Sequence, residues 1–232
     1  MYDDWYAAAT DVEGTVATLV RLAEAASVAH GAPRRVLELG IGTGRLALPL
    51  AEAGVEVHGI DASESMVAKL RAKPGGDRIQ VTIGDFADVA VEGEFAVVLL
   101  AFNALLNLMT EEAQARCLRN AAARARLVVV ETFVPGDAIP PNGVEVRHIG
   151  DDEVRLAAYR IDGGVVAGSL ISITEEGIRL RPWHLRLAPP KEIDRLAAAA
   201  GLAVAERWAG WRGEPFDDTS EHQVTVYRRD ER

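Results

Sequence analysis

The chain has 232 residues, of which 49% are hydrophobic and 26% charged, which is enough for one large domain with a substantial core. Its 35 acidic residues outnumber the 25 basic ones, and the net charge of −10 argues against sequence-independent binding of nucleic acid. The single cysteine, Cys117, excludes a disulfide framework and a cysteine-rich zinc site, and we expect no metal. Because the first residues lack a signal peptide's basic start and apolar run, we expect a cytoplasmic protein without membrane contact.

Short apolar runs alternate with helical patterns in the first half of the chain. Strands are predicted at 36–39, 55–60, 79–83, 95–101 and 127–133, and helices at 44–53, 63–73 and 111–126. Near-continuous apolar strands separated by helices predict a parallel sheet that is covered on both faces. We therefore expect an α/β fold with a doubly wound, Rossmann-like, mostly parallel sheet, and a ligand beyond the carboxyl ends of its strands.

The pattern changes after Pro135. Strand-like stretches at 144–148, 153–161, 165–174 and 177–187, joined by turns rich in glycine and acidic residues, predict an inserted antiparallel β-meander that serves as a lid or a dimer surface. A helix over 190–200 and two strands, at 203–211 and 223–228, are predicted to close the fold. The expected organisation is an N-terminal cap (1–33), a ligand-binding core (34–142 and 189–232) and the meander (143–188).

A glycine-rich turn is the sharpest local feature. Residues 37–45 read Leu-Glu-Leu-Gly-Ile-Gly-Thr-Gly-Arg, a strand that runs through three glycines toward a helix. Glycine allows positive φ and close approach of a ligand to the backbone. The dinucleotide fingerprint requires a glycine where Arg45 stands, which weakens a reading as an NAD site. A purely structural strand-to-helix turn stays open.

Three acidic residues occupy neighbouring strand ends on the same edge of the predicted sheet. Asp61 follows the second strand and can accept hydrogen bonds from both hydroxyls of a ribose. Asp85 ends the third strand, and Phe86 beside it adds a flat apolar surface suited to adenine. Glu38 lies on the first strand. Each alone could be a solvated acid, but their coincidence at one edge predicts a nucleoside site.

In order and spacing, these segments resemble the successive motifs of class I S-adenosylmethionine-dependent methyltransferases, over roughly residues 34–135. The likeness extends to small-molecule members of that class, including natural-product and sugar methyltransferases. It implies S-adenosylmethionine as the cofactor, with the glycines under its methionine and ribose parts. The cofactor-binding residues that it implies are Tyr2, Tyr6, Glu38, Gly40, Gly42, Gly44, Arg45, Asp61, Ala62, Met66, Asp85, Phe86 and Ala101.

Two features at the ends of this region bear on the resemblance. Tyr2, Trp5 and Tyr6 resemble an aromatic lead that closes over the cofactor in small-molecule methyltransferases, although aromatic residues there could equally anchor the core. The family commonly has a Pro-Gly-Gly turn before its fifth strand, whereas this chain has Ala125-Arg126-Leu127. The departure puts that turn in doubt and leaves the cofactor site untouched.

Acceptor residues are harder to assign than cofactor residues. Methyl transfer is an in-line displacement that gains from alignment, and a hydroxyl acceptor also gains from a general base. His184 is our first candidate base and Glu131 the second, although a strand histidine is commonly structural. The candidate substrate residues are Phe102, Asn103 and Trp183.

The sequence thus predicts an enzyme that transfers a methyl group from S-adenosylmethionine to a nitrogen or oxygen atom of a small molecule, such as a secondary metabolite or its sugar. No nucleic-acid or membrane partner is expected, and the meander offers a surface for a homodimer. A protein or RNA methyltransferase, or a non-catalytic regulatory domain that binds S-adenosylmethionine, are the alternatives.

Overall fold

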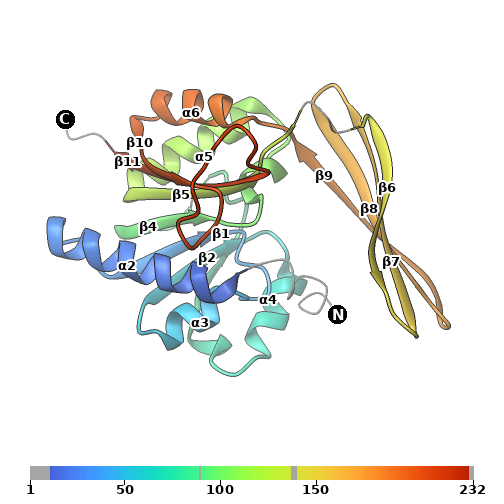
Figure 1. Ribbon diagram of the computed structural model, residues 1–232. Helices are drawn as coiled ribbons and strands as arrows, with labels where there is room; N and C mark the ends of the chain where they lie inside the picture. Colours follow the sequence, from blue (N-terminus) through green and yellow to red (C-terminus); the bar gives the residue numbers. More distant parts are fainter. Residues whose placement is uncertain (1–10, 89, 137–139, 230–232) are drawn as a thin grey trace.

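The computed structural model describes residues 11–88, 90–136 and 140–229 (Figure 1). A seven-stranded sheet lies between two layers of helices, and a separate four-stranded sheet stands beside this core (Figure 1). In the described part of the chain, no helix combines the length and the apolarity needed to cross a membrane.

The large sheet has the strand order β10-β11-β5-β4-β1-β2-β3. The strands β1 to β5 are parallel, and β11 runs antiparallel between β5 and β10. Their bounds are β1 Arg35–Leu39, β2 Glu56–Asp61, β3 Gln80–Ile83, β4 Phe95–Leu100, β5 Ala125–Phe133, β10 Leu202–Trp208 and β11 His222–Arg229. The predicted doubly wound, mostly parallel sheet is confirmed.

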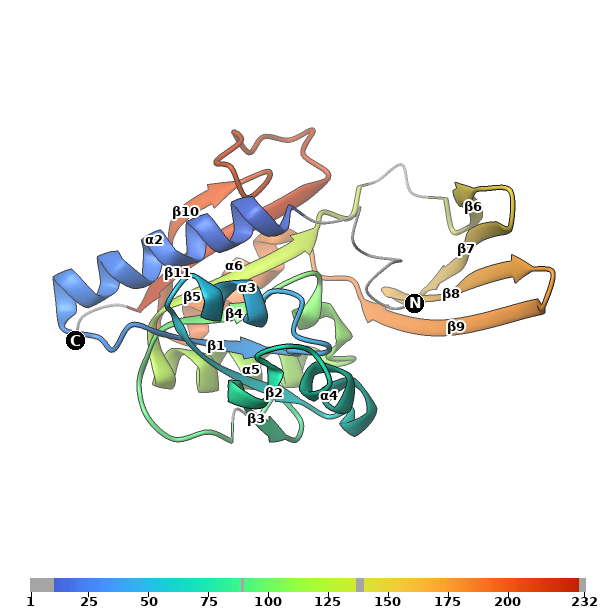
Figure 2. The same ribbon diagram turned by 90° about the horizontal axis from the view of Figure 1, so that it is seen from below.

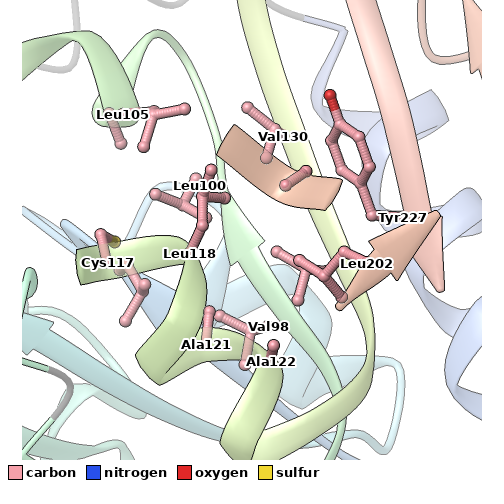
Figure 3. Close-up of a cluster of buried hydrophobic side chains, with 14 of the residues drawn as sticks. Val98, Leu100, Leu105, Cys117, Leu118, Ala121, Ala122, Val130, Leu202 and Tyr227 are labelled. Carbon is pink, nitrogen blue, oxygen red and sulfur yellow. The ribbon is translucent and has the colours of Figure 1, made fainter. Parts of the chain in front are cut away.

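Helices cover both faces of this sheet, as near-continuous apolar strands require. Alternate residues of the wholly buried β4 enter opposite cores: Val98 and Leu100 pack with α5 and α6, while Val97 and Leu99 pack on the other face. Figure 3 shows the first of these clusters, with Leu118 of α5 beside Val98 and Leu100. The helices are α2 Val12–His30, α3 Ala47–Glu52, α4 Glu64–Arg71, α5 Glu111–Arg124 and α6 Pro190–Ala199, with short 3-10 turns η2 Gly76–Arg78 and η3 Ala104–Asn107.

Most element boundaries agree with the sequence-based expectations, and three differ for local reasons. The helix expected from residue 44 begins only at Ala47, because Gly44 has φ +77°, which is incompatible with a right-handed helix. Strand β5 begins at Ala125, directly after α5, since Ala125 takes an extended conformation and needs no Pro-Gly-Gly turn. The strand expected over 203–211 ends at Trp208. Ser63 is the N-cap of α4, and its hydroxyl oxygen accepts the Met66 N–H.

The inserted strands form a second, wholly antiparallel sheet in the order β6-β7-β8-β9, which we call the meander. Its strands are β6 Asn142–Ile149, β7 Glu153–Asp162, β8 Val165–Thr174 and β9 Gly177–Arg186. Figure 2 shows the meander on the side toward which β1 and β5 point, where a doubly wound sheet places its ligand.

The register of the meander gathers apolar side chains on one of its faces. One row crosses the sheet from Val146 through Leu156 and Ile171 to Leu180. The large hydrophobic side chains of this face that stay exposed are Val144, Val146, Ile149, Ile173, Ile178 and Leu180. We call this surface the apolar face of the meander.

Candidate functional site

The glycine turn after β1 lies over the carboxyl end of β2. Gly40, Gly42 and Gly44 all have positive φ, at +82°, +55° and +77°, and the Gly40 N–H donates to the Ile60 carbonyl at 2.8 Å. A Cβ atom at Gly40 would lie 3.8 Å from Cε1 of Phe86 and 3.7 Å from Cβ of Ala104. The bare backbone of the turn therefore meets side chains that follow β3 and β4, as a composite site at the sheet edge requires.

Asp61 is bonded directly to this turn. Its Oδ2 accepts the Gly42 N–H at 2.7 Å, and its Oδ1 accepts the Ser63 N–H at 2.8 Å. Each carboxylate oxygen has a second lone pair, so both can still accept a hydroxyl proton. A Cβ at Gly42 would lie 3.6 Å from Cε of Met66, and Ala62 beside Asp61 is exposed. The predicted ribose and adenine residues of β2 and α4 thus surround the middle glycine.

Glu38 is a buried acidic residue of the site, and one of its carboxylate oxygens has no hydrogen-bond partner among the described residues. Its side chain is 5% exposed, and that oxygen is Oε2. Burial raises the pKa of Glu38 to about 8, an effect that Asp61 reinforces and the positive charge of Arg45 opposes. Arg45 also lies over the ring of Phe102, 5.2 Å from its centroid. A cationic ligand nearby would stabilise the ionised form of this buried carboxyl, so the residues present fit a sulfonium cofactor.

Asp85 and Phe86 follow β3 in the expected positions. Asp85 Oδ1 accepts the Ala87 N–H at 2.8 Å, and the side chain, which is exposed, has Arg116 4.0 Å from Oδ2. Phe86 is half-buried and packs against the core near Gly40. The ring of Phe86 therefore lies beside the glycine turn, and the exposed carboxylate of Asp85 follows the same strand.

The turn after β4 has an unusual backbone. Ala101 is buried, and the next two residues, Phe102 and Asn103, have positive φ values of +47° and +64°. The Phe102 N–H donates to Glu131 Oε2 at 2.6 Å, and the Phe133 N–H donates to Asn103 Oδ1 at 2.7 Å. The predicted substrate residues Phe102 and Asn103 are therefore fastened to the end of β5.

Glu131 accepts a second hydrogen bond, which sequence reasoning missed. Its Oε1 accepts the indole N–H of Trp211 at 2.9 Å. Trp211 lies beyond β10 and is 6% exposed. A buried tryptophan needs an acceptor for its N–H, and that rule is the only hint of this contact in the sequence.

The two meander candidates, Trp183 and His184, lie on opposite faces because neighbouring residues of a strand alternate. His184 is exposed on the side of the apolar face, and Trp183 packs over Gly168, where a Cβ would lie 2.3 Å from its ring. The aromatic residues Tyr2, Trp5 and Tyr6 lie outside the described residues. Among the residues that the structure describes, no group of three His, Cys, Asp or Glu side chains could hold a metal ion.

Sheet order, glycine turn and acidic edge together define a Rossmann-like protein with a site for a nucleoside-bearing, cationic cofactor. Comparison with known proteins agrees: residues 36–126 match the family model described as "Methyltransferase domain". The chain is 37% identical to the solved CcbJ methyltransferase from Streptomyces caelestis, covering 92% of this chain and 96% of that one, with a TM-score of 0.81.

Two further relatives share nearly the whole length. The cypemycin N-terminal methyltransferase of a Streptomyces species is 26% identical over 84% of this chain and 83% of its own. CalS10 from Micromonospora echinaspora, an amino pentose methyltransferase of calicheamicin biosynthesis solved with S-adenosylmethionine bound, has the same fold, with a TM-score of 0.70 at 22% identity over 91% of this chain and 90% of that one.

The chain belongs to the S-adenosylmethionine-dependent methyltransferases, and S-adenosylmethionine is its cofactor. When bound, the cofactor supplies a methyl group activated by a sulfonium.

Proposed function

We propose that this enzyme methylates a nitrogen or oxygen atom of a natural-product-type small molecule, a secondary metabolite or its sugar. The observation that carries the cofactor side of the proposal is the buried Glu38, whose Oε2 makes no hydrogen bond with the described residues, at the same strand edge as the Asp61–Gly42 hydrogen bond. Similarity to CcbJ along most of both chains supports it, as does the fold shared with CalS10, whose acceptor is an amino pentose.

Each cofactor residue has a role that follows from its position. Asp61 accepts the ribose hydroxyls while its bond to Gly42 sets the shape of the turn. Glu38 balances the positive charge of the ligand from its buried position. Phe86 and Met66 contact the adenine, and Asp85 accepts a hydrogen bond from its amino group.

The acceptor side is built on the turn after β4. Phe102 and Asn103 form the floor that faces the acceptor, and Trp183 of the meander contributes an aromatic wall. An amine acceptor needs only to be deprotonated and aligned, whereas a hydroxyl needs a base from the chain. The role of His184 as that base stays a prediction.

Two experiments test the proposal in sequence. Titration calorimetry with S-adenosylmethionine measures cofactor binding, and absence of binding by the intact protein would overturn the assignment. A screen with methyl-labelled cofactor against amino sugars, other small amines, hydroxylated metabolites, proteins and RNA then identifies the acceptor. Label transferred only to protein or RNA would favour that alternative, and binding without transfer to any class would favour a regulatory domain.

We also propose that two copies of the chain associate through the apolar face of the meander. Its exposed side chains include Val144, Val146 and Leu180, which are 67%, 61% and 67% exposed. The cross-strand rows that contain its exposed apolar side chains carry no Asp or Glu, so two copies could meet there without repulsion between carboxylates despite a net charge of −10. An exposed apolar patch on a charged protein is typical of an interaction surface.

A further inference from the structure

Glu131 joins two segments that are distant in the sequence. Its carboxylate accepts one N–H from Phe102, in the turn after β4, and another from Trp211, in the loop between β10 and β11. Hydrogen bonds to a charged acceptor are about twice as strong as those between neutral groups. Each oxygen of Glu131 therefore accepts one N–H, Oε2 from the backbone of Phe102 and Oε1 from the indole of Trp211.

The turn that Glu131 holds is strained. Phe102 and Asn103 both lie in the left-handed region, which costs a residue other than glycine about 1–2 kcal/mol. Besides the carboxylate contact, the main-chain carbonyl of Glu131 accepts the Asn103 N–H at 3.0 Å. One residue thus supports two consecutive strained positions, and such strain is commonly kept where a site needs a fixed shape.

Trp211 is itself held from the other side. Its carbonyl accepts the hydroxyl of Thr18 in α2 at 2.9 Å. The guanidinium of Arg212 beside it donates to both carboxylate oxygens of Asp11, the N-cap of α2, at 2.6 and 3.0 Å. The indole N–H is therefore a fixed donor, and it limits how the Glu131 side chain can turn.

We propose that Glu131 is a positioning residue for methyl transfer, one that sets the Phe102–Asn103 turn against the acceptor instead of removing a proton from it. This inference rests on the proposed function and revises the sequence-based expectation of a base at Glu131. Because the reaction is an in-line displacement, a misplacement of about 1 Å can cost about 100-fold in rate. Trp211 supports the same positioning role by donating its indole N–H to Glu131, although it is remote in sequence from every methyltransferase motif.

The test compares Glu131→Gln and Trp211→Phe with the native protein. Glutamine keeps the shape of glutamate but has one acceptor oxygen, so one of the two N–H donors loses its partner. We expect kcat to fall about 10- to 100-fold with the acceptor found in the labelled screen. The Kd for S-adenosylmethionine should stay within about twofold and the pH profile of kcat should keep its shape, because positioning carries no proton.

Trp211→Phe keeps a ring and removes the N–H, so it should lower kcat less, and the double variant should be no worse than Glu131→Gln alone. Proton exchange at the Trp211 indole, followed by NMR without any ligand, should be faster in Glu131→Gln. Asp194→Asn is the matched control, since Asp194, like Glu131, accepts two hydrogen bonds, here from the side chains of Tyr227 and Arg207 at the α6 side of the core. It should lower stability and leave kcat unchanged.

Loss of one limb of the pH profile in Glu131→Gln would show that Glu131 is a base, and unchanged kcat in both variants would show that it has no role. Either result overturns the positioning proposal while the methyltransferase assignment stands. Failure of the native protein to bind S-adenosylmethionine is the separate outcome that overturns the proposed function. Should Glu131→Gln not fold, Trp211→Phe alone decides through its kcat and pH profile.

Discussion

The Gly42 amide donates a 2.7 Å hydrogen bond to Oδ2 of Asp61, which ties the glycine turn of β1 to the acid that ends β2. The same carboxylate therefore shapes the turn and, in our proposal, accepts the ribose hydroxyls. In Asp61→Asn, one acceptor oxygen is replaced by an NH2 donor, so the N–H groups of the turn and the ribose hydroxyls compete for the one remaining acceptor oxygen. We expect the Kd for S-adenosylmethionine to rise about 10- to 100-fold by calorimetry, the equivalent of one or two charge-assisted hydrogen bonds.

Asp77→Asn provides the control for Asp61→Asn. Asp77 lies in η2 and is exposed, so its substitution makes the same change of charge away from the cofactor site. Its Kd should match that of the native protein. Equal Kd values for Asp61→Asn and Asp77→Asn would remove Asp61 from the ribose site.

Glu38 makes stability depend on pH in a defined window. Its pKa is about 8 in the folded protein against 4.5 for an ordinary glutamate, so the folded state binds more protons between these values. Stability contributed by this group consequently falls as pH rises from about 4.5 to about 8, with a slope of up to about 1.4 kcal/mol per pH unit. Urea unfolding of the cofactor-free protein should show Glu38→Gln gaining on the native protein between pH 5 and pH 8, with no further gain above.

The same carboxyl couples cofactor binding to a proton. A cation beside Glu38 favours the ionised form, so binding below pH 8 should release a proton, and affinity should rise from pH 6 to pH 8. Calorimetry in two buffers of different ionisation enthalpy measures the proton directly. Glu38→Gln should release none, and an equal release from both proteins would contradict this account.

The parallel sheet could be predicted because its strands are long apolar runs whose order is constrained by right-handed crossovers. Strand β4 shows the reason. Its side chains are apolar on both faces of the sheet, with Val98 and Leu100 on one face and Val97 and Leu99 on the other, which only a sheet covered on both faces requires. The first residue of α3 could not be predicted from the sequence, because a glycine such as Gly44 can adopt either a helical or a left-handed conformation. In the structure Gly44 is left-handed.

The position of the proposed cofactor residues in the fold was easier to predict than that of the proposed acceptor residues. Asp61 is the last residue of β2 and Asp85 lies two residues after β3, so their place at the sheet edge is a consequence of topology alone. The contact of Glu131 with Trp211 joins residues 80 positions apart, and nothing local in either segment specifies it. The buried state of Glu38 also depends on packing by neighbouring strands and not on its own motif.

Gly42 and Gly44 both have positive φ but should respond differently to substitution by alanine. In Gly44→Ala the new Cβ would lie 2.8 Å from Cδ1 of Leu70, so strain and a clash add, and stability should fall by about 2–3 kcal/mol in urea unfolding. In Gly42→Ala the nearest described atom beyond the adjacent residues is Met66 Cε at 3.6 Å, so only strain of about 1 kcal/mol is expected. The methyl group of Gly42→Ala, however, should enter the proposed cofactor site and raise the Kd for S-adenosylmethionine at least about tenfold.

Gly31→Ala calibrates this series. Gly31 has φ +65°, and among the described residues, its chain neighbours aside, no atom lies within 4 Å of where a Cβ would stand, so it reports strain alone. It should lose about as much stability as Gly42→Ala and keep the native Kd. A native Kd in Gly42→Ala as well would show that the turn does not approach the cofactor.

Trp183 and His184 test which face of β9 meets the acceptor. Arg186 lies on the same side of β9 as His184, and its guanidinium donates to Gln114 and Glu192 of the helical layer. Leu185 lies on the same side as Trp183 and packs against the core that includes η3, which follows the turn after β4. We therefore expect Trp183→Ala to raise the KM for the acceptor about tenfold or more, and His184→Ala to leave kcat and its pH profile unchanged with an amine acceptor. A loss of turnover in His184→Ala with a hydroxyl acceptor would support His184 as the base.

The apolar face of the meander predicts the oligomeric state. Val146 and Leu180 lie in one cross-strand row and are 61% and 67% exposed, so aspartate at both positions places charges in the middle of the proposed interface. Light scattering should give twice the mass of one chain for the native protein and a single-chain mass for the double variant Val146→Asp and Leu180→Asp. Val204→Asp, at a 46% exposed position of β10, introduces the same group outside the meander and should remain dimeric. A native protein of single-chain mass at micromolar concentration would contradict the proposed interface, and a dimer that survives the double variant would place it on another surface.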